Sequence, residues 1–137
     1  MQDFRFSPPT GDLSALYARV GGREKLARLL HHFYADVRQH RLLGPVFNSR
    51  IKNWPEHLDT IAAFWSRITG GPSNYSGQMP VKHLNLGIAP EHFEAWLQLW
   101  EANCRAYLDG SAAEEMISLA RDIARRLIQR IQLAAMS

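Results

Sequence analysis

Apolar residues recur along this chain at the three- and four-residue spacing of an α-helix. The clearest run lies between Gly22 and His40, where the apolar positions are Leu26, Leu29, Leu30, Phe33 and Val37. These positions share one face of a helix, and Tyr34 stands beside them. A half-buried strand would instead alternate apolar and polar residues, and no segment of the sequence does so. The pattern therefore predicts an all-α protein.

Glycines, prolines and capping residues divide the chain into further helices. The expected helices cover residues 12–20, 22–40, 53–69, 90–108 and 111–131. Pro55 and Pro90 each fall in a first turn, where a missing N–H costs little. Ser111-Ala112-Ala113-Glu114 matches a capping box and predicts the start of the last helix. Gly44-Pro45 predicts a turn that leaves room for only a short helical piece.

The composition is that of one domain of ordinary size. The chain has 137 residues, of which 46% are hydrophobic, enough for a single core over residues 1–137 with 1–11 as a loose N-terminal extension. No apolar run approaches the roughly 18 residues that span a membrane, and MQDFRFSPPT lacks the apolar stretch of a secretory signal. A single cysteine, Cys104, excludes an internal disulfide framework. We expect a cytoplasmic monomer or weak dimer.

The net charge of +3 does not indicate a nucleic-acid partner. Basic residues alternate with acidic ones, as in REKLAR and EEMISLARDIARR, which is typical of solvated helix faces. Binding to a phosphate backbone would need a dense basic patch. We therefore expect neither a nucleic acid nor a membrane as partner.

Two histidines are the candidates for metal chemistry. His57 lies on the inner stripe of its expected helix with Ile61 and Phe64, and His83 follows 26 positions later, after Gly70-Gly71 and a polar loop. Either histidine alone reads more readily as a structural or incidental one, but the pair leaves room between them for a flat ligand with a metal at its centre. A structural zinc site would need four nitrogen or sulfur ligands, and the single cysteine argues against it. The remaining histidines read as structural or surface residues: His31, His32, His40 and His92.

A haem iron needs only one protein imidazole, together with an apolar slot and a polar distal side. Tyr34, His57 and Trp96 could form that distal side, because each is a ring with a hydrogen-bond donor on the inner face of a different helix. Tyr34 and Trp96 could equally be core aromatics whose polar atoms bond to backbone carbonyls. Spacing alone leaves both interpretations open.

The order of several short motifs resembles the truncated haemoglobins, most closely their third group. The resemblance covers residues 13–131 and is carried by FYADVR at 33–38, LGPVF at 43–47, WPEHL at 54–58, FW at 64–65, YSG at 75–77, His83-Leu84 and HFEAWLQLW at 92–100. Each motif is weak by itself, but their order and spacing together are specific. The glycine pairs at 21–22 and 70–71 are more typical of the other two groups.

The resemblance implies a shortened globin, a two-over-two helical sandwich around haem b (iron protoporphyrin IX). His83 matches the proximal iron ligand, Tyr34 and Trp96 match two distal hydrogen-bonding positions, and His57 matches the distal histidine of the third group. The apolar positions that border the haem in the family match Phe33, Phe47, Ile61 and Phe64. The implied function is binding of O₂, CO or NO at an iron that keeps one position open.

Two alternatives to simple ligand binding remain. One is an enzyme that oxidises NO or reduces peroxide; it would need an external reductase, because no glycine-rich dinucleotide motif follows a strand. The other is a haem-free helical interaction module. The haem propionates would need cations, and the candidates near the two histidine segments are Arg50, Lys52, Arg67 and Lys82.

Overall fold

The computed structural model describes residues 13–75 and 88–136, and all the regular structure in these ranges is helical. The helices are α1 (Leu13–Val20), α2 (Gly22–Gln39), α3 (Leu43–Arg50), α4 (Trp54–Ile68), α6 (Pro90–Tyr107) and α7 (Gly110–Ala135). The expected all-α class is confirmed, and the boundaries from periodicity agree with the long helices to within a few residues. The N-terminal segment 1–11, the expected cap Asp12, and both Lys82 and His83 lie outside the described residues.

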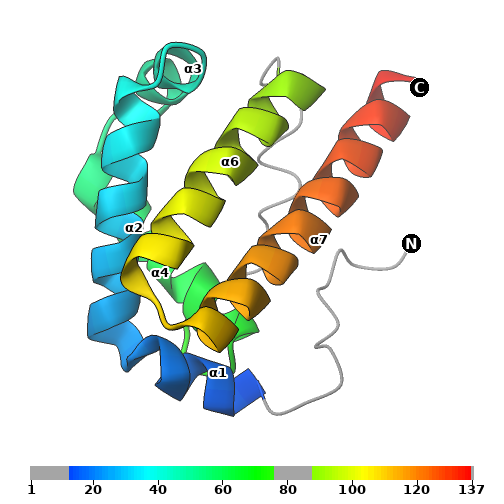
Figure 1. The fold of residues 1–137 in the computed structure, drawn as a ribbon. Coiled ribbons are helices and arrows are strands. Elements are labelled where there is room, and N and C mark those ends of the chain that lie inside the picture. The colour runs from blue at the N-terminus through cyan, green and yellow to red at the C-terminus, as the bar shows by residue number, and fades with distance from the viewer. Residues whose placement is uncertain (1–12, 76–87, 137) are drawn as a thin grey trace.

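The long helices form two pairs, as the two-over-two arrangement requires. Helix α2 packs against both α4 and α6, and α6 packs along α7. Figure 1 shows α6 and α7 side by side, with α4 behind them and α1 crossing below at one end. Helix α1 contacts α2 and α7, so the ends of the two pairs are joined on that side. The expected sandwich is therefore the fold of this chain.

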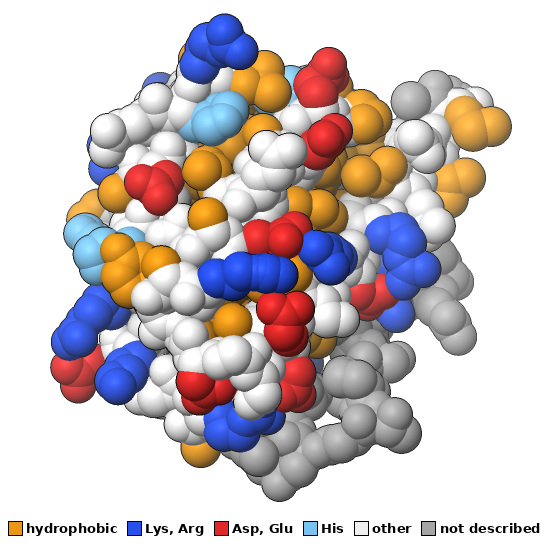
Figure 2. All heavy atoms as spheres, viewed as in Figure 1, with side chains coloured by type: hydrophobic (Ala, Val, Ile, Leu, Met, Phe, Trp, Pro, Cys, Tyr) orange, Lys and Arg blue, Asp and Glu red, His pale blue; other side chains and the backbone are white. Residues whose placement is uncertain are grey.

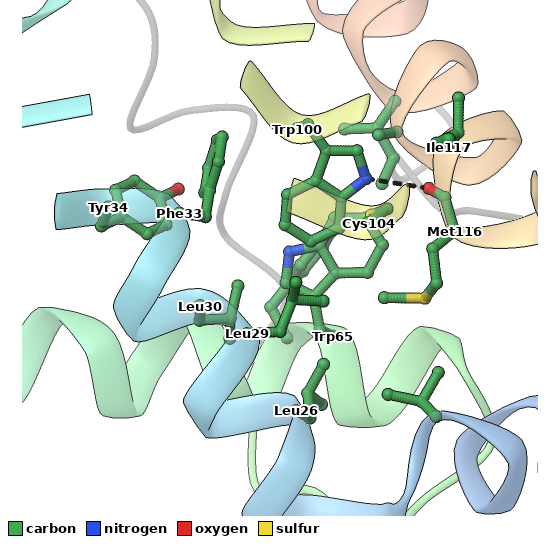
Figure 3. Packing of buried hydrophobic residues seen from close by; sticks show 14 of the residues in the cluster. Leu26, Leu29, Leu30, Phe33, Tyr34, Trp65, Trp100, Cys104, Met116 and Ile117 are labelled. Atoms are coloured by element: carbon green, nitrogen blue, oxygen red, sulfur yellow. Dashed lines mark hydrogen bonds between the residues drawn. The ribbon is translucent and has the colours of Figure 1, made fainter. Parts of the chain in front are cut away.

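Stacked tryptophans form the centre of the core. The rings of Trp65 and Trp100 lie 4.6 Å apart and nearly parallel, at 16°, and the ring of Trp96 also stacks with that of Trp100, at 5.7 Å and 8°. Figure 3 shows Trp100 above Trp65, with its indole N–H donating to the carbonyl oxygen of Met116 at 3.1 Å. That bond satisfies the one polar atom of a fully buried side chain. The stack joins α4, α6 and α7 at a single point.

Two helix starts differ from the sequence prediction. Helix α3 begins at Leu43, so Gly44-Pro45 lies within its first turn instead of forming the turn before it. Helix α7 begins at Gly110, capped by Asp109, whose carboxylate accepts from the N–H of Ala112 at 3.1 Å. The capping box at Ser111 was therefore wrong: Ser111 is inside the helix, and its hydroxyl accepts from Arg19 at 2.7 Å. The capping bond lowers the pKa of Asp109, because it stabilises the charged carboxylate.

The segment after α4 is tied back onto that helix. Gly70 adopts φ 93°, a conformation that favours glycine. At Gly71 a Cβ would stand 2.4 Å from the ring of Tyr17, so only glycine lets α1 approach this closely. The hydroxyls of Ser66 and Ser73 then donate to the carbonyls of Pro72 and Ala63 at 2.5 and 2.6 Å. These contacts fix how the chain leaves α4.

Charges of both signs are interspersed on the surface. Figure 2 shows basic and acidic side chains next to one another across the face in view. Arg105 pairs with Glu114 at 3.2 Å and Arg121 with Glu101 at 2.8 Å, which link α6 to α7. None of the helices in the described ranges is both long and apolar enough to cross a membrane.

Candidate functional site

A cavity of about 140 Å³ lies between the two helix pairs. Helices α2, α3, α4, α6 and α7 all contribute to its wall. The side chains that line it are Tyr34, Leu43, Val46, Phe47, His57, Ile61, Phe64, Trp65, Ile88, His92, Phe93, Trp96, Ile123, Ala124 and Leu127. Most of them are aliphatic or aromatic, and the rings that carry a polar group are those of Tyr34, His57, Trp65, His92 and Trp96. An apolar cavity with a few polar groups is the usual form of a small-molecule or cofactor site.

A second cavity, of about 530 Å³, adjoins the first. The two share the side chains of Val46, Phe47, His57, Ile61, Phe64 and Ile88. The rest of the second cavity is more polar and is lined by Arg50, Ile51, Lys52, Asn53, Glu56, Thr60 and Tyr75. Together they form an apolar interior that continues into a polar mouth with two cations.

Tyr34 and Trp96 form a buried polar pair on the cavity wall. Tyr34 is only 4% exposed, and this burial raises the pKa of its phenol to about 12. A hydrogen bond with the Trp96 side chain lowers that pKa and so opposes part of the effect of burial. An indole N–H can only donate, so the phenol oxygen is the acceptor and the phenol O–H stays available for another partner. Tyr34 is thus a neutral donor throughout the physiological pH range.

His57 lies on α4 at the boundary between the two cavities, since it lines both. Its ring is 6.0 Å from that of Tyr34 and perpendicular to it, at 87°. It belongs to a helix with a well-defined start, because the Asn53 side chain accepts from the N–H of Glu56 at 3.1 Å. The structure therefore brings Tyr34, His57 and Trp96 together from α2, α4 and α6.

The other expected site residues divide into three sets. Phe47, Ile61 and Phe64 line the cavity. Phe33 is fully buried one layer behind it, with its ring edge-on to Trp96 at 5.1 Å and to Trp100 at 4.9 Å. The expected iron ligand His83 lies outside the described residues.

The four cations expected to contact the haem propionates do not all lie at one place. Arg50 and Lys52 line the polar mouth of the second cavity. Arg67 instead donates to the carbonyl oxygen of Tyr75 at 2.8 Å and so holds the segment after α4. Lys82 lies outside the described residues.

His92 was expected to be a structural or surface residue, and its place on the cavity wall was not predicted. It is half-buried and lines the first cavity, while its Nδ1 accepts from the N–H of Ala89 at 2.9 Å at the start of α6. The accepting nitrogen carries no proton, so the proton of the neutral ring is on Nε2. His31 and His32 are exposed, and the Nδ1 of His40 accepts from the N–H groups of Leu42 and Leu43, as structural residues do.

The wall contributed by α7 was also absent from the sequence prediction. Ile123, Ala124 and Leu127 lie on the buried face of α7, and the same face borders the cavity. Helical spacing identifies such residues as buried. It does not tell whether their side chains contact another helix or border a cavity. Within residues 13–75 and 88–136, no three side chains of His, Cys, Asp or Glu gather closely enough to hold a metal ion.

Comparisons with known proteins point to one family. The family model described as "Bacterial-like globin" matches residues 15–130. The chain is 42% identical, over 84 residues, to the group 3 truncated haemoglobin ctb of Campylobacter jejuni; the match covers 58% of this chain and 66% of the relative, just under two thirds of its length. It is 27% identical to the group 2 truncated haemoglobin YjbI of Bacillus subtilis, over 81% of this chain and 86% of that one. The crystal structure of the group III truncated haemoglobin from Campylobacter jejuni superimposes with a TM-score of 0.76 at 33% identity, covering 80% of this chain and 91% of the other.

Proposed function

The chain belongs to the bacterial-like globin family, and from this we propose that it is a haem protein whose cavity binds a diatomic ligand, O₂, CO or NO. The observation that carries the proposal is the convergence of three hydrogen-bond donors, Tyr34, His57 and Trp96, on one apolar cavity. Polar groups that border an apolar cavity can be satisfied by a polar ligand held inside it, and the phenol O–H of Tyr34 is available for such a ligand.

The residues that are present fit a haem. The inner cavity offers aliphatic and aromatic side chains to the apolar porphyrin faces, and the outer cavity continues it towards a polar mouth. Arg50 and Lys52 at that mouth are suited to the two propionates, which need cations or water when the porphyrin is bound. An apolar slot that ends in cations matches a group with an apolar body and two carboxylates at one edge.

When bound, the haem iron supplies the site at which the diatomic ligand attaches. In this proposal His83 would provide the imidazole that holds the iron, by its match to the family's proximal position. The remaining work belongs to the distal side chains. Tyr34 donates its phenol O–H towards the ligand, Trp96 holds the phenol oxygen, and His57 stands between the inner cavity and the mouth. The aromatic lining around them excludes water.

The physical consequence is slow release of a polar ligand. A net hydrogen bond contributes about 0.5–1.5 kcal/mol, and more where water is excluded. Two such donors would slow O₂ dissociation by roughly one to two factors of ten. The neutral state of Tyr34, whose pKa is about 12, keeps that donor in place across neutral pH.

The proposal is tested by the absorption spectrum of the purified protein with added haem. We expect a Soret band that shifts on reduction and on exposure to CO, and we expect His83→Ala to lose or strongly alter it. The matched control is His31→Ala, which removes an exposed histidine of α2 and leaves the spectrum as it is. An unaltered band in His83→Ala would overturn the axial assignment. A wild-type protein that takes up no haem would overturn the function and favour a helical interaction module.

A further inference from the structure

Trp54 is a residue of the distal region that does not itself line the cavity. It is the first residue of α4, and its ring lies 5.6 Å from that of His57, at 88°. The same ring lies 6.0 Å from that of Tyr34, at 49°. His57 and Tyr34 both line the inner cavity, so Trp54 contacts two of the three distal donors from behind.

Arg38 covers Trp54 in turn. Its guanidinium carbon lies 4.6 Å from the centre of the indole ring, within the range of a cation–π interaction. Arg38 is in the last turn of α2 and is exposed, whereas Trp54 is half-buried. The order from the inside outwards is therefore cavity, donors, Trp54, Arg38 and solvent.

This layering restricts the rings that face the cavity. Perpendicular ring contacts are favourable only over a limited range of orientations, so Trp54 limits how the imidazole of His57 can turn. His57 lies between the inner cavity and the mouth, and a turn of its ring would change both the donor geometry and the opening.

We propose that Arg38 and Trp54 act as positioning residues that fix His57 and Tyr34 in the orientation needed to hold a bound ligand. Neither residue touches the ligand; they act through the two donors. The inference rests on the proposed haem function. It adds that Arg38 and Trp54, outside the cavity, control the orientation of the distal donors. A charged side chain in solvent thereby sets the behaviour of a buried site.

The test uses the haem-loaded protein in its CO form, because the C–O stretching band in the infrared reports the polar groups around the ligand. Wild type is expected to show one dominant band. Trp54→Leu keeps an apolar side chain but removes the ring contacts, so the band is expected to split or broaden as the donors take several orientations. The O₂ dissociation rate should rise by about 2- to 10-fold, the range expected when one hydrogen bond is weakened.

Variants of Arg38 separate positioning from simple stability. Arg38→Met keeps the aliphatic stem and removes the charge, and it should move the band in the same direction as Trp54→Leu, by a smaller amount. Arg38→Lys restores a cation and should recover much of the wild-type band. The matched control is Arg28→Met, which removes another exposed α2 arginine, one that pairs with Glu24 at 3.2 Å; it should leave the band unchanged.

The outcomes distinguish this inference from the function on which it rests. If wild type takes up no haem, the proposed function fails. If Tyr34→Phe shifts the band while Trp54→Leu and Arg38→Met leave it as in wild type, the haem function stands and the positioning role is wrong. Should Trp54→Leu fail to fold, the exposed Arg38→Met carries the test alone, and an unchanged band there would overturn the proposal.

Discussion

The most informative perturbation is a double-mutant cycle on Tyr34 and Trp96. Tyr34→Phe removes the phenol O–H and, with it, the oxygen that accepts the Trp96 hydrogen bond. Trp96→Phe removes the indole N–H and leaves an aromatic ring in contact with Phe33 and Trp100. Because the two side chains are hydrogen-bonded to each other, we expect their effects on O₂ release to be coupled.

The size of the effect follows from the arrangement of the donors. Losing one net hydrogen bond to the ligand costs about 0.5–1.5 kcal/mol, which corresponds to an O₂ dissociation rate about 2 to 13 times faster. Trp96 polarises the phenol by donating to its oxygen, so Trp96→Phe weakens the donation of Tyr34 to the ligand. The double variant should therefore lose less ligand stabilisation than the sum of the two single variants, with a coupling energy of about 0.5–1.5 kcal/mol, no larger than the effect of one substitution.

The assay is stopped-flow displacement of O₂ by CO from the ferrous protein at 25 °C. The ratio of each variant to wild type should stay constant from neutral pH up to about pH 10, because the pKa of Tyr34 is about 12. Additive effects of the two substitutions, within about 0.5 kcal/mol, would refute the coupling. Dissociation rates equal to wild type in both single variants would refute the assignment of Tyr34 as a ligand donor and of Trp96 as the side chain that supports it.

Two further predictions concern stability. Burial raises the pKa of Cys104 from 9.0 to about 12, so the unfolded thiol ionises first and Cys104 alone should lower the free energy of unfolding by roughly 4 kcal/mol between pH 9 and pH 12. Tyr34, whose pKa burial also raises to about 12, adds to the decline equally in wild type and in the variant. In urea titrations the free energy of unfolding of Cys104→Ala should therefore fall less steeply with pH than that of wild type, and equal slopes would contradict the prediction. Asn53→Ala removes the cap of the helix that carries His57 and should lower the free energy of unfolding by about 1 kcal/mol, whereas Asn74→Ala, an exposed residue outside the helices, serves as the control. A loss no larger than that of the control would argue that the Asn53 bond does not stabilise α4.

Much of the fold could be predicted from the sequence because helices are local. The apolar stripe from Leu26 to Val37 identified α2 and its buried face without any knowledge of the neighbouring helices. Pro90 marked the first residue of α6, and Gly70 followed the end of α4. The spacing of apolar residues and the positions of proline and glycine affect only the backbone within a turn or two. Their effects can therefore be predicted from the sequence alone.

Local signals also misled where two of them competed. Ser111 and Glu114 have the spacing of a capping box, but Asp109 lies two residues earlier and accepts the bond from Ala112 instead. A carboxylate in extended backbone at the end of a short connection is the better acceptor for a helix N-terminus, where the partial charge is positive. The helix therefore begins at Gly110.

The sequence by itself determined that the chain is helical, where its long helices lie and which rings could serve a haem. Only the tertiary structure decided which of those rings meet. It placed Phe33 behind the cavity, brought His92 and the α7 residue Ile123 to its wall, and set Arg38 over Trp54. The physical reason is that helical period fixes which side of a helix is buried. Whether that side meets another side chain or a cavity depends on how helices far apart in the sequence cross.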